Sequence, residues 1–426
     1  LFFYAWGEPR WILLLLASIL VTWLLGRAMR PEAGAGRRRG LLILGLVFQL
    51  GLLVAVKYAG FFFGAFIDLP KLHLPLGVSF YTFHAISYLV DVYRQKTPPQ
   101  KNLLRLGLYL ALFPKLVMGP IVPYHELEPA LAQRTIDAQD ASDGCFRFTI
   151  GLAKKALLAD ALAGLVTGIW GDLASLTVLS AWLGLIGYAL QLYFDFSGYS
   201  DMAIGLGRML GFRFPENFRY PYLCSSISDF WRRWHISLGS WFKEYLYFPL
   251  GGSRTGTLRT LRNLLLVWLA TGLWHGASWN YVLWGLYFGV LICLEKLLAP
   301  RFRAHPRKGL LAGLYRPVCL LLAVLGWVLF RAEDLPAAGR YFACLFGGAA
   351  GASAQARLYL HDFWPVLLLG AVGATPLCAK LAGRLGAKLQ PGVRAAVQAV
   401  LVLALLACST VWLLNGSFQS FVYFQF

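Results

Sequence analysis

His275 is the residue whose type and position in this sequence most clearly indicate chemistry. It ends an apolar segment that begins after Arg262, and spacings of three and four residues place Trp268, Thr271 and His275 on one face of a helix. An ionisable side chain inside an apolar segment is costly to keep unless it is paired or lines a cavity. Because an imidazole can take up and return a proton near neutral pH, we predict that His275 is a general base. The alternative is a structural histidine bonded to a carbonyl or a tryptophan.

A second histidine, His235, lies in a segment with the pattern of an amphipathic helix. Between Asp229 and Tyr245, aromatic side chains recur on one helical stripe, and basic side chains lie largely away from it. Such a helix suits a membrane surface, where His235 is either packed or lies on the path of a substrate. The basic residues predicted to meet substrate phosphates or lipid headgroups are Arg232, Arg233 and Lys243.

Acidic and small residues follow the apolar segment 179–194. Asp195 and Asp201 stand there among glycines and serines, so we expect the helix to break. In one interpretation Ser197 caps a new helix whose first turn holds Asp201. In the other, the broken helix lines a polar cavity, because irregular backbone at membrane depth is tolerated there. We further predict that Asp195 and His275 line the same cavity.

Composition indicates a multi-pass membrane protein. Of the 426 residues, 58% are hydrophobic and 14% are charged, and the mean hydropathy is +0.60. We expect one membrane domain over residues 1–426. The formal charge of +19 comes largely from short loops between apolar segments, where basic residues set topology and meet membrane lipid. Nucleic-acid binding is therefore not expected.

Metal and disulfide chemistry find no support in the sequence. The seven histidines show no HxxxH spacing, and the seven cysteines show no CxxC spacing and lie mostly in apolar segments. We therefore expect no metal site and no disulfide framework. The sequence starts at Leu1 without a methionine, and we expect that residues precede it.

Apolar segments of sufficient length predict about ten membrane spans. Residues 104–120 are predicted as the fourth span, and residues 40–67 as a longer one that is tilted or broken near Lys57 and Gly60. Segments 261–275 and 281–298 are predicted to form a hairpin, since both of its outer flanks are basic. The loops predicted to be cytoplasmic from their excess of Lys and Arg are 31–40, 94–104, 254–262 and 301–308.

Several long sequence blocks follow one another over nearly the whole chain. They include LPLGVSFYTFHAISYLVDVYR (74–94), FPKLVMGPIVPYHEL (113–127), QLYFDFSGYSDMAIGLGRMLGFRFPENFRYPY (191–222), FWRRWHISLGSWFKEYLYFPLGGSR (230–254) and GLWHGASWNYVLWG (272–285). Together these blocks resemble the membrane-bound O-acyltransferase family, and within it the alginate O-acetyltransferase branch. Teichoic-acid D-alanylation proteins share the ENF and RWHISL blocks, whereas the PLGGSR ending is more similar to the acetyltransferases.

The resemblance implies an all-α polytopic membrane protein with about ten transmembrane helices, plus re-entrant and interfacial helices around a central tunnel. It also implies that His275 is the catalytic histidine in this tunnel and that His235, a second catalytic candidate, lies near its cytoplasmic entrance. The donor-binding candidates are Arg232, Arg233 and Lys243. The tunnel-lining candidates are Asp195, Ser197, Asp201, Trp279 and Asn280.

The reaction implied by the resemblance moves a short acyl group, most simply acetyl, from a cytoplasmic thioester to hydroxyls of an extracytoplasmic polysaccharide. The donor would be acetyl-CoA or an acyl-carrier thioester, and the site the bacterial cytoplasmic (inner) membrane. The resemblance also implies an extracytoplasmic acyltransferase partner of SGNH type. D-alanyl transfer by the same fold is one alternative. Others are a channel or transporter with broken helices at Asp195 and His275, and an inactive assembly scaffold.

Overall fold

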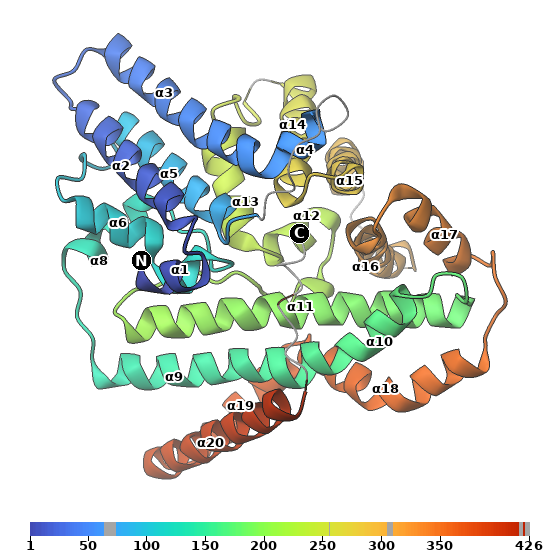
Figure 1. Ribbon diagram of the computed structural model, residues 1–426. Coiled ribbons are helices and arrows are strands. Elements are labelled where there is room, and N and C mark those ends of the chain that lie inside the picture. The colour runs from blue at the N-terminus through green and yellow to red at the C-terminus, as the bar shows by residue number, and fades with distance from the viewer. Residues whose placement is uncertain (64–73, 255, 305–309, 417–420, 422–426) are drawn as a thin grey trace. The chain divides into compact units, whose positions relative to one another are not determined.

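The computed structural model describes residues 1–63, 74–254, 256–304, 310–416 and 421, and every regular element in these ranges is helical (Figure 1). The all-α prediction is therefore confirmed. The chain forms two compact units, each assembled from separate segments: 1–145, 203–216 and 240–249 in the first, and 146–202, 217–239 and 250–426 in the second. The single membrane domain expected from the sequence stays a prediction.

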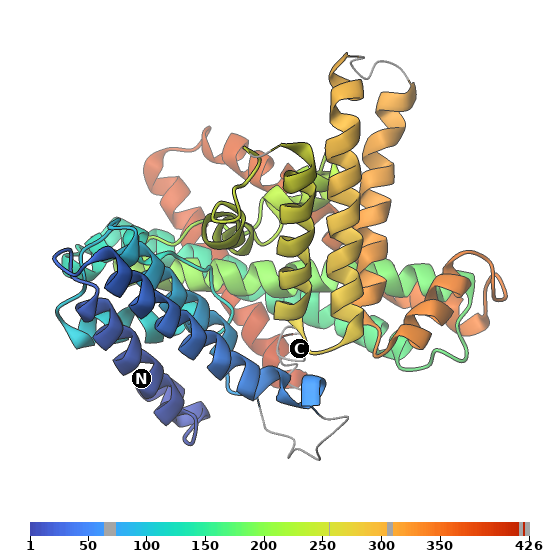
Figure 2. The same cartoon turned by 90° about the horizontal axis from the view of Figure 1, so that it is seen from above.

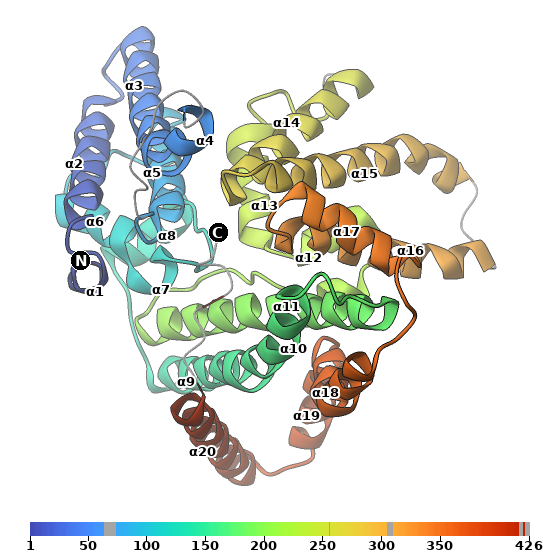
Figure 3. The same cartoon turned by 45° about the vertical axis from the view of Figure 1, so that its right-hand side comes forward.

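The first unit is organised around α5 (Val78–Tyr93), which is buried along nearly its whole length. Helices α2 (Ile12–Ala28) and α3 (Ala35–Leu53) pack against it and against each other (Figures 1 and 3). Gln49 joins α3 to α2, because its amide accepts from Ser18 Oγ at 3.1 Å and donates to Thr22 Oγ1 at 2.8 Å. The other helices of this unit are α1 (Phe2–Gly7), α4 (Ala59–Phe63), α6 (Leu103–Ala111), α7 (Phe113–Leu116) and α8 (Tyr124–Ala132).

One predicted span of the first unit differs from the structure, and a second agrees with it in the described residues. Residues 104–120 do not form one helix, because α6 ends at Ala111 and α7 at Leu116. Pro114 explains the break, since it has no N–H to donate to the preceding turn. The span predicted over residues 40–67 is present as one helical segment, because α3 continues through a π-helical turn at Val54–Tyr58, which contains Lys57, into α4. The helix does not break at Gly60. The predicted extension to residue 67 lies outside the described residues.

The second unit contains the longest apolar helices together with several short ones. Three helices belong partly to each unit. Helix α9 (Ala138–Ala153) begins in the first unit and ends in the second, whereas α11 (Val178–Met209) and α13 (Ile236–Phe242) begin in the second and end in the first. The remaining helices of the second unit are α10 (Asp160–Trp170), α12 (Ile227–Arg233), α14 (Thr257–His275), α15 (Trp279–Ala304), α16 (Leu310–Arg331), α17 (Leu335–Leu345), α18 (Ala354–Gly373), α19 (Leu377–Gly386) and α20 (Pro391–Asn415).

Helix α11 is continuous through the polar run at Asp195, so the predicted break and the cap at Ser197 are wrong. Basic side chains of α9 and of the π-helical turn that follows it form ion pairs with both carboxylates. Asp195 pairs with Lys155 at 2.8 Å, and Asp201 pairs with Arg147 and with Lys154, both at 2.6 Å. Charges that are paired in this way do not require the helix to open.

The glycines of the same run serve close packing between two helices. A Cβ on Gly198 would lie 2.7 Å from the carbonyl oxygen of Gly151, and a Cβ on Gly151 would lie 2.5 Å from that of Gly198. Helices α9 and α11 lie side by side here (Figures 1 and 3). Small residues at a helix contact allow this approach, which explains a glycine-rich stretch without a break.

Helices α14, α15 and α16 lie side by side (Figure 2). Helices α14 and α15 form the predicted hairpin, and glycines again allow close approach. A Cβ on Gly285 would meet Gly272 Cα at 3.0 Å. The hairpin places His275 at the end of α14, directly before the turn.

The segment 229–245 is not the single amphipathic helix that its pattern predicted. It divides into α12 and α13, because His235 between them adopts a left-handed φ of 45°. The backbone groups freed by this break bond to one neighbouring segment. Arg219 N donates to Arg233 O at 2.9 Å, and Ile236 N donates to Asn217 O at 3.0 Å.

Five helices of the described part of the chain are long and apolar enough to cross a membrane, or six if the pair α18 and α19, bent by 67°, is one span. They are α3 with α4, α11, the first part of α15, α16 from residue 314, and α20. The predicted span 104–120 is absent from this group, and so is α2, an apolar helix of 17 residues. A multi-pass membrane protein is thus indicated, whereas the count of about ten is not confirmed.

Candidate active site

His275 lies inside a cluster of aromatic rings in the second unit, with 7% of its surface exposed. Its imidazole makes edge-to-face contacts with Trp274 and Trp284, each at 4.9 Å between ring centroids, and with Phe330 at 5.1 Å. These rings come from α14, α15 and α16. The buried position predicted for His275 from the sequence is therefore confirmed, while its role as a base is not tested by position alone.

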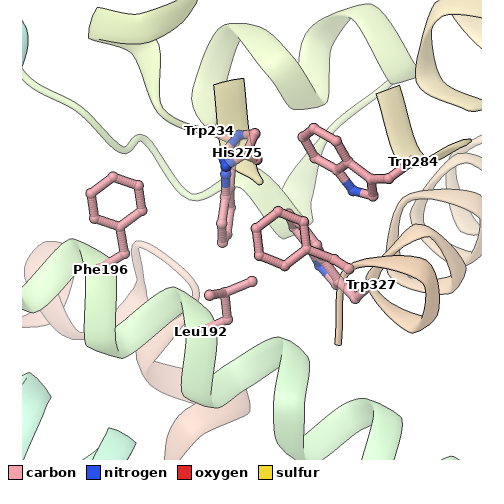
Figure 4. Close-up of a pocket in the computed structure, with 7 residues that line it drawn as sticks. Leu192, Phe196, Trp234, His275, Trp284 and Trp327 are labelled. Atoms are coloured by element: carbon pink, nitrogen blue, oxygen red, sulfur yellow. The ribbon is translucent and has the colours of Figure 1, made fainter. Parts of the chain in front are cut away.

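A small cavity of ≈ 10 Å³ adjoins the His275 ring. Side chains from α11, α15, α16 and the residue that follows α12 enclose it, as Figure 4 shows. A cavity of this size is about the smallest that can hold one water molecule. The lining residues are Leu192, Phe196, Trp234, His275, Trp284, Trp327 and Phe330.

The chemistry available in this cavity follows from its lining. Apart from the ring nitrogens of His275 and of the tryptophans, the lining side chains are hydrocarbon. Aromatic walls of this kind exclude bulk water and lower the local dielectric, which strengthens any interaction between an imidazole and a reacting group. A general base placed here acts on a bound substrate in preference to solvent.

His235 lies one aromatic layer away from His275 and is also buried, with 2% exposed. Its ring stands edge-on to Phe196, at 4.6 Å between centroids, and lies 6.3 Å from Trp274. Both of these rings also adjoin His275 or its cavity. Burial lowers the pKa of His235 to about 3, so its imidazole is neutral near neutral pH.

The predicted donor-binding residues occupy accessible positions. Arg232 is exposed, and Arg233 is half-buried and pairs with Asp229 at 3.0 Å on the same helix. Lys243, in the first unit, is exposed and lies over the ring of Phe248 at 5.6 Å. Positive charge is therefore available at these positions, and its assignment to a donor stays a prediction.

The five tunnel-lining candidates are not among the residues that line the His275 cavity. Asp195 and Asp201 form the ion pairs with α9 and its following turn, and Ser197 is buried with no hydrogen-bond partner for its Oγ among the described residues. Asn280 donates to Ala332 O at 2.6 Å, and Trp279 is 62% exposed. Phe196, the residue after Asp195, reaches the cavity instead. A tunnel role for the five stays a prediction.

Several residues of the site are not signalled by the sequence. Trp327 and Phe330 lie in an apolar segment that looks like any span, and their place at the cavity depends on the packing of α16 against α15. Leu192 and Phe196 come from the helix whose break was predicted. Asn217 stands in the ENF block, but spacing alone does not indicate that it faces His235.

Glu295 is a half-buried carboxylate without a predicted role. From α15 it accepts hydrogen bonds from the backbone N–H groups of Ile227 at 3.0 Å and Ser228 at 2.8 Å, and from Tyr315 Oη at 2.6 Å. A carboxylate at the first turn of a helix is favoured by the unsatisfied N–H groups and the helix dipole. Glu295 thus fixes the start of α12, the helix that leads directly to Trp234 and His235.

The described residues contain no group of three or more His, Cys, Asp or Glu side chains that could hold a metal ion. The groups that make up the candidate site are the two histidines, the aromatic side chains around the cavity and the hydrogen bonds of Asn217.

Comparisons with known proteins give this geometry a context. The profile described as "MBOAT, membrane-bound O-acyltransferase family" matches residues 2–313. The chain is 43% identical over 358 residues to a Pseudomonas aeruginosa protein named "Probable alginate O-acetylase AlgI", covering 81% of this chain and 68% of the relative. It is 36% identical over 374 residues to the peptidoglycan O-acetyltransferase of Helicobacter pylori, covering 79% and 70%. It is 29% identical over 249 residues to the teichoic acid D-alanyltransferase of Bacillus subtilis, covering 53% and 62%. The resemblance predicted from the sequence blocks is confirmed.

Proposed function

Because the chain belongs to the membrane-bound O-acyltransferase family, we propose that it transfers a short acyl group, first of all acetyl, from a cytoplasmic thioester toward hydroxyls of an extracytoplasmic polysaccharide. The observation that carries this proposal is the buried His275 at the end of α14, beside a cavity with aromatic walls. The proposed setting is the bacterial cytoplasmic membrane.

His275 is the proposed general base. Its neutral imidazole takes the proton of the attacking hydroxyl while that oxygen forms a bond to the thioester carbonyl carbon. As the C–S bond breaks, the imidazolium returns the proton to the leaving thiolate. The products are an ester and a free thiol, and no further reactant is needed. The aromatic wall supports this step because it keeps water away from a thioester that water would hydrolyse.

Access to His275 requires side-chain movement. The present cavity of ≈ 10 Å³ has room for about one water molecule. An acetyl thioester is larger, so at least one ring of the wall must move when the donor enters. Such movement is expected of side chains at a site that excludes solvent between turnovers.

The donor is proposed to be acetyl-CoA or an acyl-carrier thioester. Both carry phosphate groups, and Arg232, Arg233 and Lys243 are proposed to bind them, Arg through paired N–H groups and Lys as a point charge. His235 is proposed to lie on the donor's path. The acceptor is proposed to be reached through an extracytoplasmic partner of SGNH type, which completes the transfer to the polymer.

The proposal is tested with purified protein in lipid vesicles. Radiolabelled acetyl-CoA and an acetylated acyl carrier are supplied in parallel, and a D-alanyl carrier thioester serves as the competing donor. Acetyl transfer to a hydroxyl acceptor at a rate well above hydrolysis supports the proposal. Transfer of D-alanine alone would show that the protein transfers D-alanyl groups and not acetyl groups. Solute flux across the vesicle membrane without any acyl transfer would favour a channel or transporter.

A further inference from the structure

Asn217 is the most highly connected polar side chain near the two histidines, and it is fully buried. Its Oδ1 lies 3.1 Å from Ser237 N, 3.0 Å from Ser237 Oγ and 3.2 Å from His235 Nδ1. Its Nδ2 lies 3.1 Å from Ser200 Oγ. The side chain therefore joins the α12–α13 break to α11.

These contacts determine which atom of the amide faces His235. A backbone N–H can only donate, so the amide atom opposite Ser237 N must be the oxygen. That oxygen accepts, and His235 Nδ1, which faces the same oxygen, must therefore carry a proton. In a neutral imidazole with a proton on Nδ1, Nε2 holds a lone pair and can only accept.

The backbone of His235 supports the same arrangement. A left-handed φ of 45° at a residue other than glycine is strained and persists where its surroundings enforce it. Asn217 supplies part of this restraint, since its carbonyl oxygen accepts from Ile236 N at 3.0 Å. Asn217 thus holds His235 by main chain and side chain.

His235 Nε2 has no hydrogen-bond partner among the described residues, and it is buried. A buried acceptor without a donor is costly, and it is retained where a ligand completes it. The neighbouring rings of Phe196 and Trp274 make no hydrogen bond to Nε2, so the donor hydrogen is left to come from a molecule that binds beside them.

We propose that Asn217 is the positioning residue of His235: it keeps the imidazole proton on Nδ1 and leaves Nε2 to accept a hydrogen bond from an O–H or N–H group of a bound substrate. This proposal rests on the proposed acyl transfer for the identity of the substrate. The proposed position of the imidazole proton on Nδ1 does not depend on whether the protein transfers acyl groups. The hydrogen could come from the hydroxyl of the acceptor or from an amide of the donor.

The tautomer is tested on full-length protein labelled with ¹⁵N-histidine, with His235 assigned by loss of its signals in His235→Gln. We expect a neutral ring with the proton on Nδ1 in the unchanged protein and in Asn217→Asp, where a carboxylate oxygen replaces the amide oxygen. Asn217→Ala should lose this preference. A proton on Nε2 in the unchanged protein would overturn the proposal, whether or not the protein transfers acyl groups.

Kinetics test the consequence. Asn217→Ala should lower kcat/KM by roughly 10- to 100-fold, the range known for removal of the partner that orients a metal-binding histidine. Asn217→Asp should restore part of this loss and shift the pH profile. The variant with both Asn217→Ala and His235→Ala should be no slower than His235→Ala alone. Additive losses would show that Asn217 acts independently of His235 and would contradict the proposal.

Asn263 provides the matched control. It is likewise buried, and its Nδ2 donates to the backbone oxygens of Leu250 at 3.0 Å and Gly252 at 3.1 Å. Asn263→Ala should lower the melting temperature as Asn217→Ala does and leave the His235 tautomer unchanged. His235→Ala shows which substrate donates the hydrogen bond to Nε2. A rise in the KM for the thioester alone indicates an amide of the acyl donor, and a rise in the KM for the acceptor alone indicates its hydroxyl.

Discussion

Lys155→Met removes a buried cation from between two buried carboxylates, and we expect it to destabilise the second unit strongly. Lys155 Nζ lies 2.7 Å from Asp160 and 2.8 Å from Asp195, and Lys155 is 5% exposed. Methionine replaces the length of the side chain without its charge, so the change isolates the ion pairs. Removing one partner of a buried pair costs about 3–5 kcal/mol. The expected fall in melting temperature is therefore on the order of 5–10 °C.

The adjacent lysine is the control for this experiment. Lys154 pairs with Asp201 at 2.6 Å, but its side chain is 25% exposed and Arg147 also pairs with Asp201. Lys154→Met should therefore cost about 1 kcal/mol or less. Melting is followed in detergent by tryptophan fluorescence, and acyl transfer is measured on the same samples.

A second outcome would refute the reasoning. If Lys155→Met and Asp195→Asn abolished acyl transfer while melting stayed unchanged, the charges would serve the His275 site and would not hold α11 against the turn after α9. The double variant gives a further check. Because Lys155 and Asp195 are in contact, the loss in Lys155→Met with Asp195→Asn should be smaller than the sum of the single losses, by about 0.5–3 kcal/mol.

Three further expectations follow from the same structure. Glu295→Gln should destabilise the start of α12 by about 1–3 kcal/mol, because the amide NH₂ of glutamine would face one of the two backbone N–H groups that the carboxylate now accepts from. Hydrogen exchange should show earlier loss of amide protection at the start of α12, and unchanged exchange would contradict this. The free energy of unfolding should fall as the pH falls from 6.5 toward 3, because burial lowers the pKa of His235 to about 3 in the folded protein and the unfolded chain therefore binds the proton more tightly. His235→Gln should flatten this dependence. Cysteines introduced in loops 31–40, 94–104, 254–262 and 301–308 should resist an impermeant thiol reagent in intact cells, and labelling of any one loop would break the predicted topology.

The sequence predicts the parts of this protein that depend on local pattern. A histidine at the end of an apolar helix, the α14–α15 hairpin and the all-helical class follow from periodicity and composition. The predicted helix break at Asp195 failed because it was judged from one segment. Asp195 and Asp201 are compensated by Lys155, Lys154 and Arg147, which lie some 40 to 54 positions away in sequence.

The site itself depends on contacts that no local pattern encodes. Trp327 and Phe330 have the same character as other aromatic residues in apolar helices, and only packing brings them to His275. The division of the segment 229–245 at His235 has no local signal, since a left-handed φ is uncommon at any residue other than glycine and is held here by Asn217. Prediction from sequence therefore reached His275 and His235 but not the residues that orient them.

The most direct measurement is acetyl transfer by His275→Ala in a reconstituted system with labelled acetyl-CoA, beside the unchanged protein. His361→Ala serves as the control, because His361 has a side chain that is 84% exposed. We predict that His275→Ala loses ~10²- to 10⁴-fold in rate, as expected for the loss of a general base, with expression and melting near normal. His361→Ala should keep full activity. If His275→Ala retains more than about a tenth of the rate, His275 is not the base, and the account of the site is wrong.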